Sequence, residues 1–235
     1  DSQKVHVMHE LSKDNPWRLV VTYDDTRAKE IFDDFSYFEP NTWLYPARDL
    51  LFFQADIHGN LLIRQRMRVI RALLEQEEVT VVTSIDGCMD FLMPLEKIRS
   101  RLLHFKSDSV IDLDQLKEEL VELGYERTGQ VELPGQFSVR GGIIDIYPLT
   151  EDNPWRIELW DDEVDSIRSF DAESQRSLEN VDEITIYPAA EKMDGEDMVS
   201  FLDYFPEEKT LVFLDELNHL AENGEGVEEE YRQSR

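Results

Sequence analysis

Apolar residues in the first part of the chain occur in short runs separated by longer amphipathic segments. Three runs have the length of buried strands: residues 17–22, 42–45 and 79–82. Two longer segments, 24–38 and 60–76, have the apolar spacing of helices. Strands that alternate with helices indicate parallel βαβ units. The pattern therefore predicts an α/β domain with a parallel sheet over residues 1–102.

The helix expected over residues 60–76 presents two different faces. Its apolar face repeats at helical spacing: Ile63, Met67, Ile70 and Leu74. A second face carries Arg64, Arg68 and Arg71, a stripe that could contact nucleic acid. However, the whole chain has a net charge of -28, which repels phosphate. We expect a solvated face and keep an RNA- or DNA-binding stripe as an alternative.

After residue 102 the pattern becomes that of closely spaced strands. A helix over 112–123 comes first, with Asp112 as N-cap and Gly124 at its end. Six short strands then follow: near 127–132, 136–140, 143–148, 155–160, 163–170 and 183–187. Turn residues separate them, as in an antiparallel sheet. This predicts an inserted β-rich α+β domain over residues 103–189.

The α/β pattern returns in residues 190–235. A helix is expected over 194–205 and a buried strand over 209–214. The simplest architecture is therefore a parallel-sheet domain that is split by the inserted domain. Both chain ends look cut, so we expect a piece of a longer protein.

Composition limits where such a protein works. Cys88 is the single cysteine, which fits a reducing cytoplasm rather than a disulfide framework. The chain has no apolar run near 20 residues and no secretion leader. His6 and His9 are one helical turn apart, but no other ligand pattern accompanies them, so we expect no metal site. These features predict a cytoplasmic protein with no membrane partner.

The strand over 209–214 ends in Asp215 and Glu216, which is the layout of a Walker B site. Its usual partner, a glycine-rich loop ending in Gly-Lys-Ser/Thr, is missing. Lys4 could reach a phosphate, but Gln3 and Val5 stand where a glycine and a hydroxyl are needed. The terminal residues are either a degenerate P-loop or unrelated to one. In both cases we predict no catalytic residue, no cofactor and no enzyme activity for this chain.

Strand alternation in the inserted domain gathers a different kind of surface. Over 155–160, Arg156, Glu158 and Trp160 share one face, opposite an apolar face. Over 136–140, Ser138 and Arg140 likewise share a face. Arginine and tryptophan are enriched at binding hot spots. The alternative is an Arg156–Glu158 surface pair, with Trp160 buried by the neighbouring domain.

The chain resembles a known family over nearly its whole length. The resemblance is carried by residues 133–148, 154–168, 174–177 and 186–191, and earlier by 43–46, 65–66 and 84–88. These segments are similar in residues and spacing to the UvrB-homology region of the bacterial transcription-repair coupling factors (Mfd). The resemblance implies a degenerate RecA-like domain split by a β-rich domain that binds UvrA. The stretch from Pro46 to Asn60 lacks the tyrosine-rich hairpin of UvrB, which favours the coupling factors.

The resemblance also implies which residues meet the partner. UvrA contacts map onto Arg140, Arg156, Glu158 and Trp160, with tryptophan where phenylalanine is usual. Ser138 stands where UvrB tends to have arginine, so that contact is not expected here. The module would recruit UvrA for nucleotide excision repair at lesions where RNA polymerase has stalled.

The remaining implications concern the parent protein. It would be a translocase on double-stranded DNA that releases RNA polymerase, with ATP and Mg²⁺ held in its motor domains. Its C-terminal region would mask the UvrA face. An ATP-using damage-recognition fragment of the UvrB type stays as the alternative function.

Overall fold

The computed structural model describes residues 2–48, 56–191 and 197–224. The chain forms two compact units. The first comprises Asp1–Pro94 together with Asp197–Arg235, and the second comprises Leu95–Glu196.

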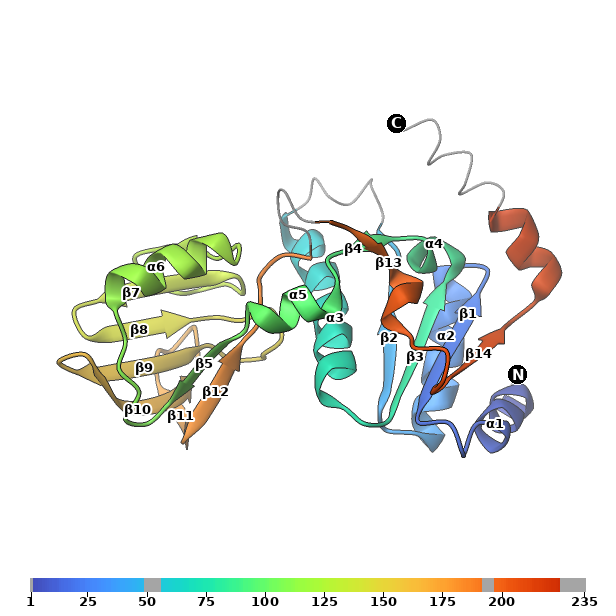
Figure 1. Cartoon of the computed structure of the whole chain (residues 1–235), viewed down its shortest axis with the longest axis horizontal. Helices are drawn as coiled ribbons and strands as arrows, with labels where there is room; N and C mark the ends of the chain where they lie inside the picture. Colours follow the sequence, from blue (N-terminus) through green and yellow to red (C-terminus); the bar gives the residue numbers. More distant parts are fainter. Residues whose placement is uncertain (1, 49–55, 192–196, 225–235) are drawn as a thin grey trace. The chain divides into compact units, whose positions relative to one another are not determined.

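A four-stranded parallel sheet forms the centre of the first unit (Figure 1). Its order is β14-β1-β3-β2. The bounds are Trp17–Thr22 for β1, Thr42–Tyr45 for β2, Val79–Ser84 for β3 and Thr210–Leu214 for β14. All residues of β1 and β3 are buried, as their continuous apolar runs require in a sheet covered on both faces. The strands predicted from the apolar runs and their parallel pairing are confirmed.

Two helices, α1 (Ser2–Leu11) and α2 (Asp25–Phe38), share a buried cluster with one face of this sheet. Its members come from both helices and two strands: Val5, Met8, Val20, Ala28, Ile31, Phe35 and Val82. Asp24 caps α2 by accepting a hydrogen bond from the backbone N–H of Arg27 at 2.7 Å. The predicted helix over 24–38 is therefore confirmed, whereas α1 was not expected from the sequence.

The helix predicted over 60–76 is α3 (Asp56–Glu75), but its buried face is rotated from the expected one. Its fully buried positions include Arg66, Met67, Val69 and Ile70, while Ile63 and Leu74 are only half-buried. Arg66 belongs to this buried face, where its guanidinium lies 4.2 Å from the centre of the Tyr45 ring. Arg64, Arg68 and Arg71 are half-buried, and Arg71 Nε pairs with Glu75 at 3.0 Å.

The helix predicted over 194–205 is wrong for most of its length. Residues 192–196 lie outside the described residues. Beyond them, β13 (Val199–Ser200) pairs with β4 (Phe91–Leu92), and only a 3-10 helix follows at Phe201–Tyr204. The Ser200 side chain accepts from the backbone N–H of Leu202, and Asp203 accepts from the backbone N–H of Ser200. This capping box begins a helix at 201, so the residues before it cannot continue one.

A six-stranded sheet forms the centre of the second unit, with order β11-β10-β9-β8-β7-β6 (Figure 1). The bounds are Glu126–Arg127 for β6, Gln136–Arg140 for β7, Ile143–Ile146 for β8, Trp155–Trp160 for β9, Glu163–Phe170 for β10 and Ser177–Val181 for β11. All neighbours are antiparallel except β6 and β7. The predicted antiparallel sheet is confirmed, although the strand expected over 127–132 shrinks to two residues.

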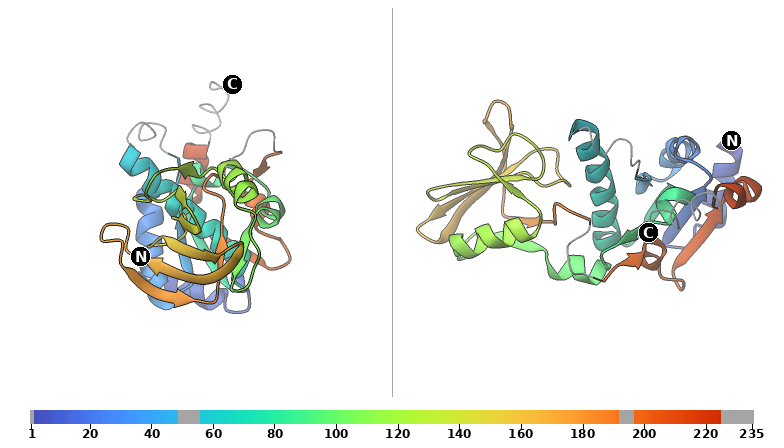
Figure 2. Two further views of the ribbon diagram at one scale, coloured as in Figure 1. Left: turned by 90° about the vertical axis from the view of Figure 1, so that its left-hand side faces the viewer. Right: turned by 90° about the horizontal axis from the view of Figure 1, so that it is seen from above.

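The helix α6 (Leu113–Glu122) covers one face of this sheet (Figure 2). Leu116 and Leu120 of the helix join Phe137, Ile144 and Ile157 of the strands in one core. The predicted cap is confirmed, because Asp112 Oδ1 accepts from the backbone N–H groups of Asp114 and Gln115 at 2.9 and 3.1 Å. The opposite face of the sheet is left for polar residues.

The strand predicted near 183–187 does not join the main sheet. It forms β12 (Glu183–Ile186) and pairs with β5 (Leu103–Lys106) in a separate two-stranded antiparallel sheet. The edge position of the main sheet is taken by β11, which the sequence did not reveal. Shorter helices lie at Ile85–Cys88 (α4) and Leu95–Ser100 (α5).

Candidate functional site

The polar face of the six-stranded sheet is assembled by strand register. Asp145 of β8 lies opposite Ser138 of β7 on one side and Arg156 of β9 on the other. Arg156 in turn lies opposite Arg168 of β10. Directly opposed residues on neighbouring strands project to the same face. The register therefore places arginines and carboxylates from four strands side by side.

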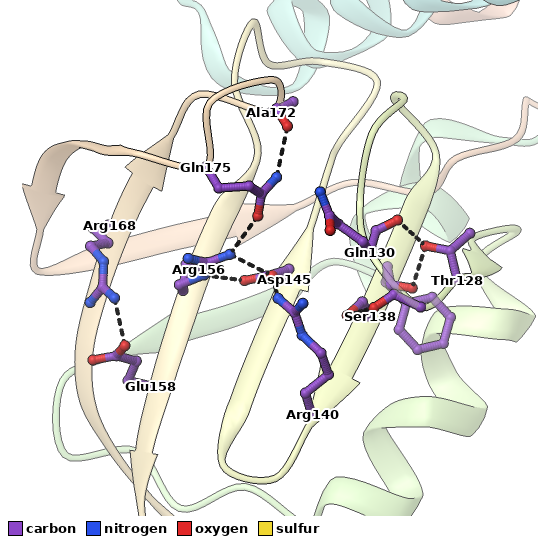
Figure 3. A network of polar contacts seen from close by, with 12 residues as sticks. Thr128, Gln130, Ser138, Arg140, Asp145, Arg156, Glu158, Arg168, Ala172 and Gln175 are labelled. Atoms are coloured by element: carbon purple, nitrogen blue, oxygen red, sulfur yellow. Dashed lines mark hydrogen bonds and ion pairs between the residues drawn. The ribbon is translucent and has the colours of Figure 1, made fainter.

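Asp145 joins the two predicted arginines (Figure 3). Its Oδ1 accepts from Arg156 Nε at 2.7 Å, and its Oδ2 accepts from Arg156 Nη2 at 2.8 Å. The same Oδ2 accepts from Arg140 Nη2 at 2.7 Å. Asp145 is fully buried, so both of its oxygens are neutralised by charged donors, as a buried carboxylate requires.

Arg156 is held by two further groups. Its Nη2 donates to Gln175 Oε1 at 3.0 Å, and its guanidinium lies 4.2 Å from the centre of the Phe170 ring. Gln175 has a positive φ of 59°, and its amide donates to the carbonyl oxygen of Ala172 at 2.7 Å. The side chain of Arg156 is consequently only 13% exposed.

Glu158 has a different partner from the one expected. Arg168 Nη2 donates to Glu158 Oε1 at 2.5 Å, and Ser166 Oγ donates to Glu158 Oε2 at 3.4 Å. The hydrogen bond from Arg168 holds the pKa of Glu158 below its ordinary value. The alternative of an Arg156–Glu158 surface pair is therefore wrong, because each residue pairs across the strands with another partner.

Two of the predicted residues remain accessible on this face. Trp160 ends β9 with its side chain largely open, at 80% exposure, and Arg140 has 45% of its side chain exposed. Among the described residues of its own unit, no other strand or helix covers Trp160. Ser138 is fully buried, and its Oγ donates to the carbonyl oxygen of Gly129 at 3.3 Å. The face thus presents one arginine and one tryptophan around a fixed polar centre.

Sequence reasoning missed Asp145, Arg168 and Gln175. A signal for Asp145 was present, because it is the single acid between Ile144 and Ile146, which point to the core. Alternation alone places it on the polar face. No local signal identifies Gln175, since its contact with Arg156 depends on the path of the chain after β10.

The acids at the end of β14 form a second cluster, in the first unit. Lys4 forms ion pairs with Asp215 and, at 3.0 Å, with Glu216. Arg27 Nε pairs with Asp215 Oδ2 at 3.0 Å, and Arg27 Nη1 pairs with Glu30 at 2.9 Å. The structure therefore does bring together Lys4, Asp215 and Glu216, and adds Arg27.

The electrostatics of this second cluster do not fit a bound Mg²⁺. Burial raises the pKa of Asp215, but the hydrogen bonds and charges of Lys4 and Arg27 outweigh it, so its pKa lies below the ordinary value. The carboxylate that would hold a metal already faces two cations of the chain itself. Residues Gln3 to Val5 lie in the first turn of α1. Within 2–48, 56–191 and 197–224, no group of three or more histidine, cysteine or acidic residues could hold a metal ion.

Comparison with known proteins identifies a family match within the β-rich unit. Residues 103–191 match the family described as "UvrB interaction domain". The chain is 41% identical over 175 residues to the transcription-repair-coupling factor of Bacillus subtilis (strain 168), covering 74% of this chain and 15% of that protein. It is 34% identical over 204 residues to the protein of the same name from Staphylococcus aureus (strain USA300), covering 86% of this chain and 17% of the relative. For Staphylococcus haemolyticus (strain JCSC1435) the identity is 33% over 192 residues, covering 81% and 16%.

The chain thus spans less than a fifth of the length of the curated relatives it matches. Among the helices of the described residues, none has both the length and the apolar character needed to cross a membrane.

Proposed function

The chain belongs to the transcription-repair-coupling factor family, and on that premise we propose that its β-rich unit is a docking module for UvrA. The observation that carries the proposal is the polar face of the six-stranded sheet. There Arg140 is exposed beside the fixed pair of Arg156 and Asp145, and Trp160 is exposed farther along β9. Exposed arginine and tryptophan around a preorganised centre have the composition of a binding hot spot.

The test is calorimetric titration of the 235-residue chain with purified UvrA. Arg140→Ala and Trp160→Ala should each weaken binding by about tenfold or more, because hot-spot truncations cost about 2 kcal/mol. Arg127→Ala is the matched control, since Arg127 is an exposed arginine of β6 in the same sheet. No binding by the unaltered chain, or equal losses in the control, would reject UvrA docking at this face.

The role of the module in the parent protein follows from that docking. The parent is proposed to be an ATP-driven translocase on double-stranded DNA that releases stalled RNA polymerase, with ATP and Mg²⁺ in motor domains outside this chain. The docking face would then bring UvrA to the lesion. A parent that carries Arg140→Ala should still release stalled polymerase in vitro but recruit less UvrA to the same template.

Masking of this face by the parent's C-terminal region is a further part of the proposal. A masked face binds its partner more weakly, because the contact that covers it must first be broken. The 235-residue chain should therefore bind UvrA more tightly than the full parent does. Equal affinities of the two proteins would exclude masking while leaving the docking proposal intact.

The alternative function, an ATP-using fragment of the UvrB type, needs a nucleotide site in the first unit. We propose instead that this unit binds no nucleotide, because Asp215 is paired with Lys4 and Arg27. Fluorescent ATP titrated into this chain, and into a longer one that begins upstream of Asp1, decides between them. Saturable, Mg²⁺-dependent binding by either would favour the UvrB-type reading.

A further inference from the structure

Asp145 occupies the centre of the polar face but is itself out of reach of a partner. It is fully buried, and its two oxygens accept three hydrogen bonds from two guanidinium groups. We propose that Asp145 is a positioning residue, which fixes Arg140 so that its remaining donors face a carboxylate of the docked protein. This inference rests on the proposed docking function.

Arg156 forms the rigid base of the arrangement. Its Nε and Nη2 donate to the two oxygens of Asp145 in the parallel two-bond geometry that suits a guanidinium and a carboxylate. Gln175 accepts a further hydrogen bond from this guanidinium, which also lies over the ring of Phe170. With 13% of its side chain exposed, Arg156 offers little to a partner and instead fixes the orientation of Asp145.

Arg140 is the arginine that the arrangement presents (Figure 3). Its Nη2 alone donates to Asp145, and 45% of its side chain is exposed. A guanidinium has five N–H donors, so a single bond through Nη2 leaves donors on Nε and Nη1 for another acceptor. Because Asp145 restrains one end of the guanidinium, less side-chain entropy is lost when a partner binds the rest.

The charge count of the face indicates an acidic partner group. Within the hydrogen-bonded cluster, three guanidiniums meet two carboxylates: Arg140, Arg156, Arg168, Asp145 and Glu158. The exposed acid Glu163 lies farther along the face, opposite Trp160. Arg156 is matched by Asp145 and Arg168 by Glu158, so the surplus positive charge resides on Arg140. This local surplus is notable on a chain of net charge -28. An aspartate or glutamate on the docked surface can accept two parallel bonds from such a guanidinium.

Asp145→Asn separates positioning from simple attraction by the sign of its effect. The substitution keeps the shape of the side chain but makes the face more positive by one charge. If the face acted only through its net charge, an acidic partner would bind Asp145→Asn more tightly. If Asp145 positions Arg140, binding to UvrA should weaken by about tenfold or more, with an increase in the dissociation rate. Asp165→Asn, an exposed acid on β10, is the matched control with the same charge change.

A readout without UvrA accompanies the titration. The Nε–Hε NMR signal of Arg156 should exchange slowly with water in the unaltered chain and rapidly in Asp145→Asn, while Asp165→Asn leaves it unchanged. Chemical-shift spectra establish that the fold persists. If Arg140→Ala weakens binding but a folded Asp145→Asn binds as well as or better than the unaltered chain, positioning by Asp145 is refuted and docking stands. If the unaltered chain does not bind UvrA, the docking proposal fails, and the positioning inference fails with it, whatever the NMR signal shows.

If Asp145→Asn unfolds the chain, Gln175→Ala can be used instead to loosen the side chain of Arg156. This variant removes one acceptor of Arg156 and leaves the buried carboxylate paired. Binding to UvrA should then fall by a smaller factor, about threefold, and the Arg156 Nε–Hε signal should again exchange faster. Unchanged binding and exchange in Gln175→Ala would contradict the rigid base on which the inference depends.

Discussion

The ring of Tyr45 lies stacked on the ring of Phe201, with 3.9 Å between the ring centres and 10° between the planes. Tyr45 ends β2 before the inserted unit, and Phe201 begins the 3-10 helix after it. Both side chains are fully buried, and the guanidinium of Arg66 also lies over the Tyr45 ring. This stack therefore joins the two segments of the first unit that the insertion separates.

Replacing Phe201 by alanine should destabilise the first unit by about 3 kcal/mol, because a buried aromatic ring is lost and a cavity remains. Chemical denaturation followed by circular dichroism measures this loss. Leu202→Ala is the control, since Leu202 is exposed in the same 3-10 helix and should change stability by less than about 0.5 kcal/mol. Equal effects of the two substitutions would show that the stack does not join the segments.

The ion pairs of Asp215 should also contribute to stability. Asp215→Asn leaves Arg27, which is nearly buried, without one of its carboxylates, and should cost about 2 kcal/mol. Lys4→Met should cost less, under about 1 kcal/mol, because Lys4 is largely exposed. Denaturant unfolding at pH 7 measures both. A more stable Asp215→Asn would mean that desolvation of this carboxylate exceeds its pairing energy.

The same carboxylate predicts a pH dependence. The folded-state pKa of Asp215 lies below its ordinary value of 3.8, so its contribution is present above that value and is lost as pH falls through the folded pKa. The stability difference between the unaltered chain and Asp215→Asn should therefore be constant near neutrality and shrink below about pH 4. Unfolding curves at a series of acidic pH values test this. A difference that grows on acidification would contradict the lowered pKa.

Local sequence patterns predicted the strands and missed most long-range partners. Apolar runs located β1 and β3, because a strand that is covered on both faces is apolar at almost every position. The edge strand β11 was missed because four of its five residues are exposed, and Leu178 is the only apolar residue among those four. Such a segment has no apolar periodicity. The helix expected over 194–205 was wrong because the cap at Ser200 sets a later start.

The site shows the same division. Alternation correctly placed Arg156, Glu158 and Trp160 on one strand face, because that relation is local. It could not show that Asp145 binds Arg156 and that Arg168 binds Glu158, since those pairs depend on the register between strands. The cluster of Lys4 with Asp215 and Glu216 was suggested by the likeness of the strand end to a Walker B site. The structure does bring the three together, with Lys4 in the first turn of α1.

Cys88 should be unreactive in the folded chain. Burial raises the pKa of its thiol to about 12, so little thiolate forms near neutrality. Reaction with a disulfide reagent at pH 8 should be on the order of a thousandfold slower than in urea, where the thiol has its ordinary pKa. The rate of absorbance change with excess reagent measures this ratio. Similar rates in the folded and unfolded chain would place Cys88 at an accessible position.

Trp160 should contribute to binding without contributing to stability. With 80% of the residue exposed at the end of β9, its truncation removes few contacts within the chain, so Trp160→Ala should change the free energy of unfolding by less than about 0.5 kcal/mol. Its affinity for UvrA should nevertheless fall by about tenfold or more, mainly through faster dissociation, because a large aromatic anchor is lost. Trp160→Phe should keep much of the affinity, since a smaller ring still covers part of the partner surface.

Leu178→Ala is the control. It removes an exposed apolar side chain from β11 of the same sheet and should leave the affinity for UvrA unchanged. Surface-based kinetics with all three variants, beside their denaturation curves, measure both quantities, and equal affinity losses for Trp160→Ala and Leu178→Ala would remove Trp160 from the docking face.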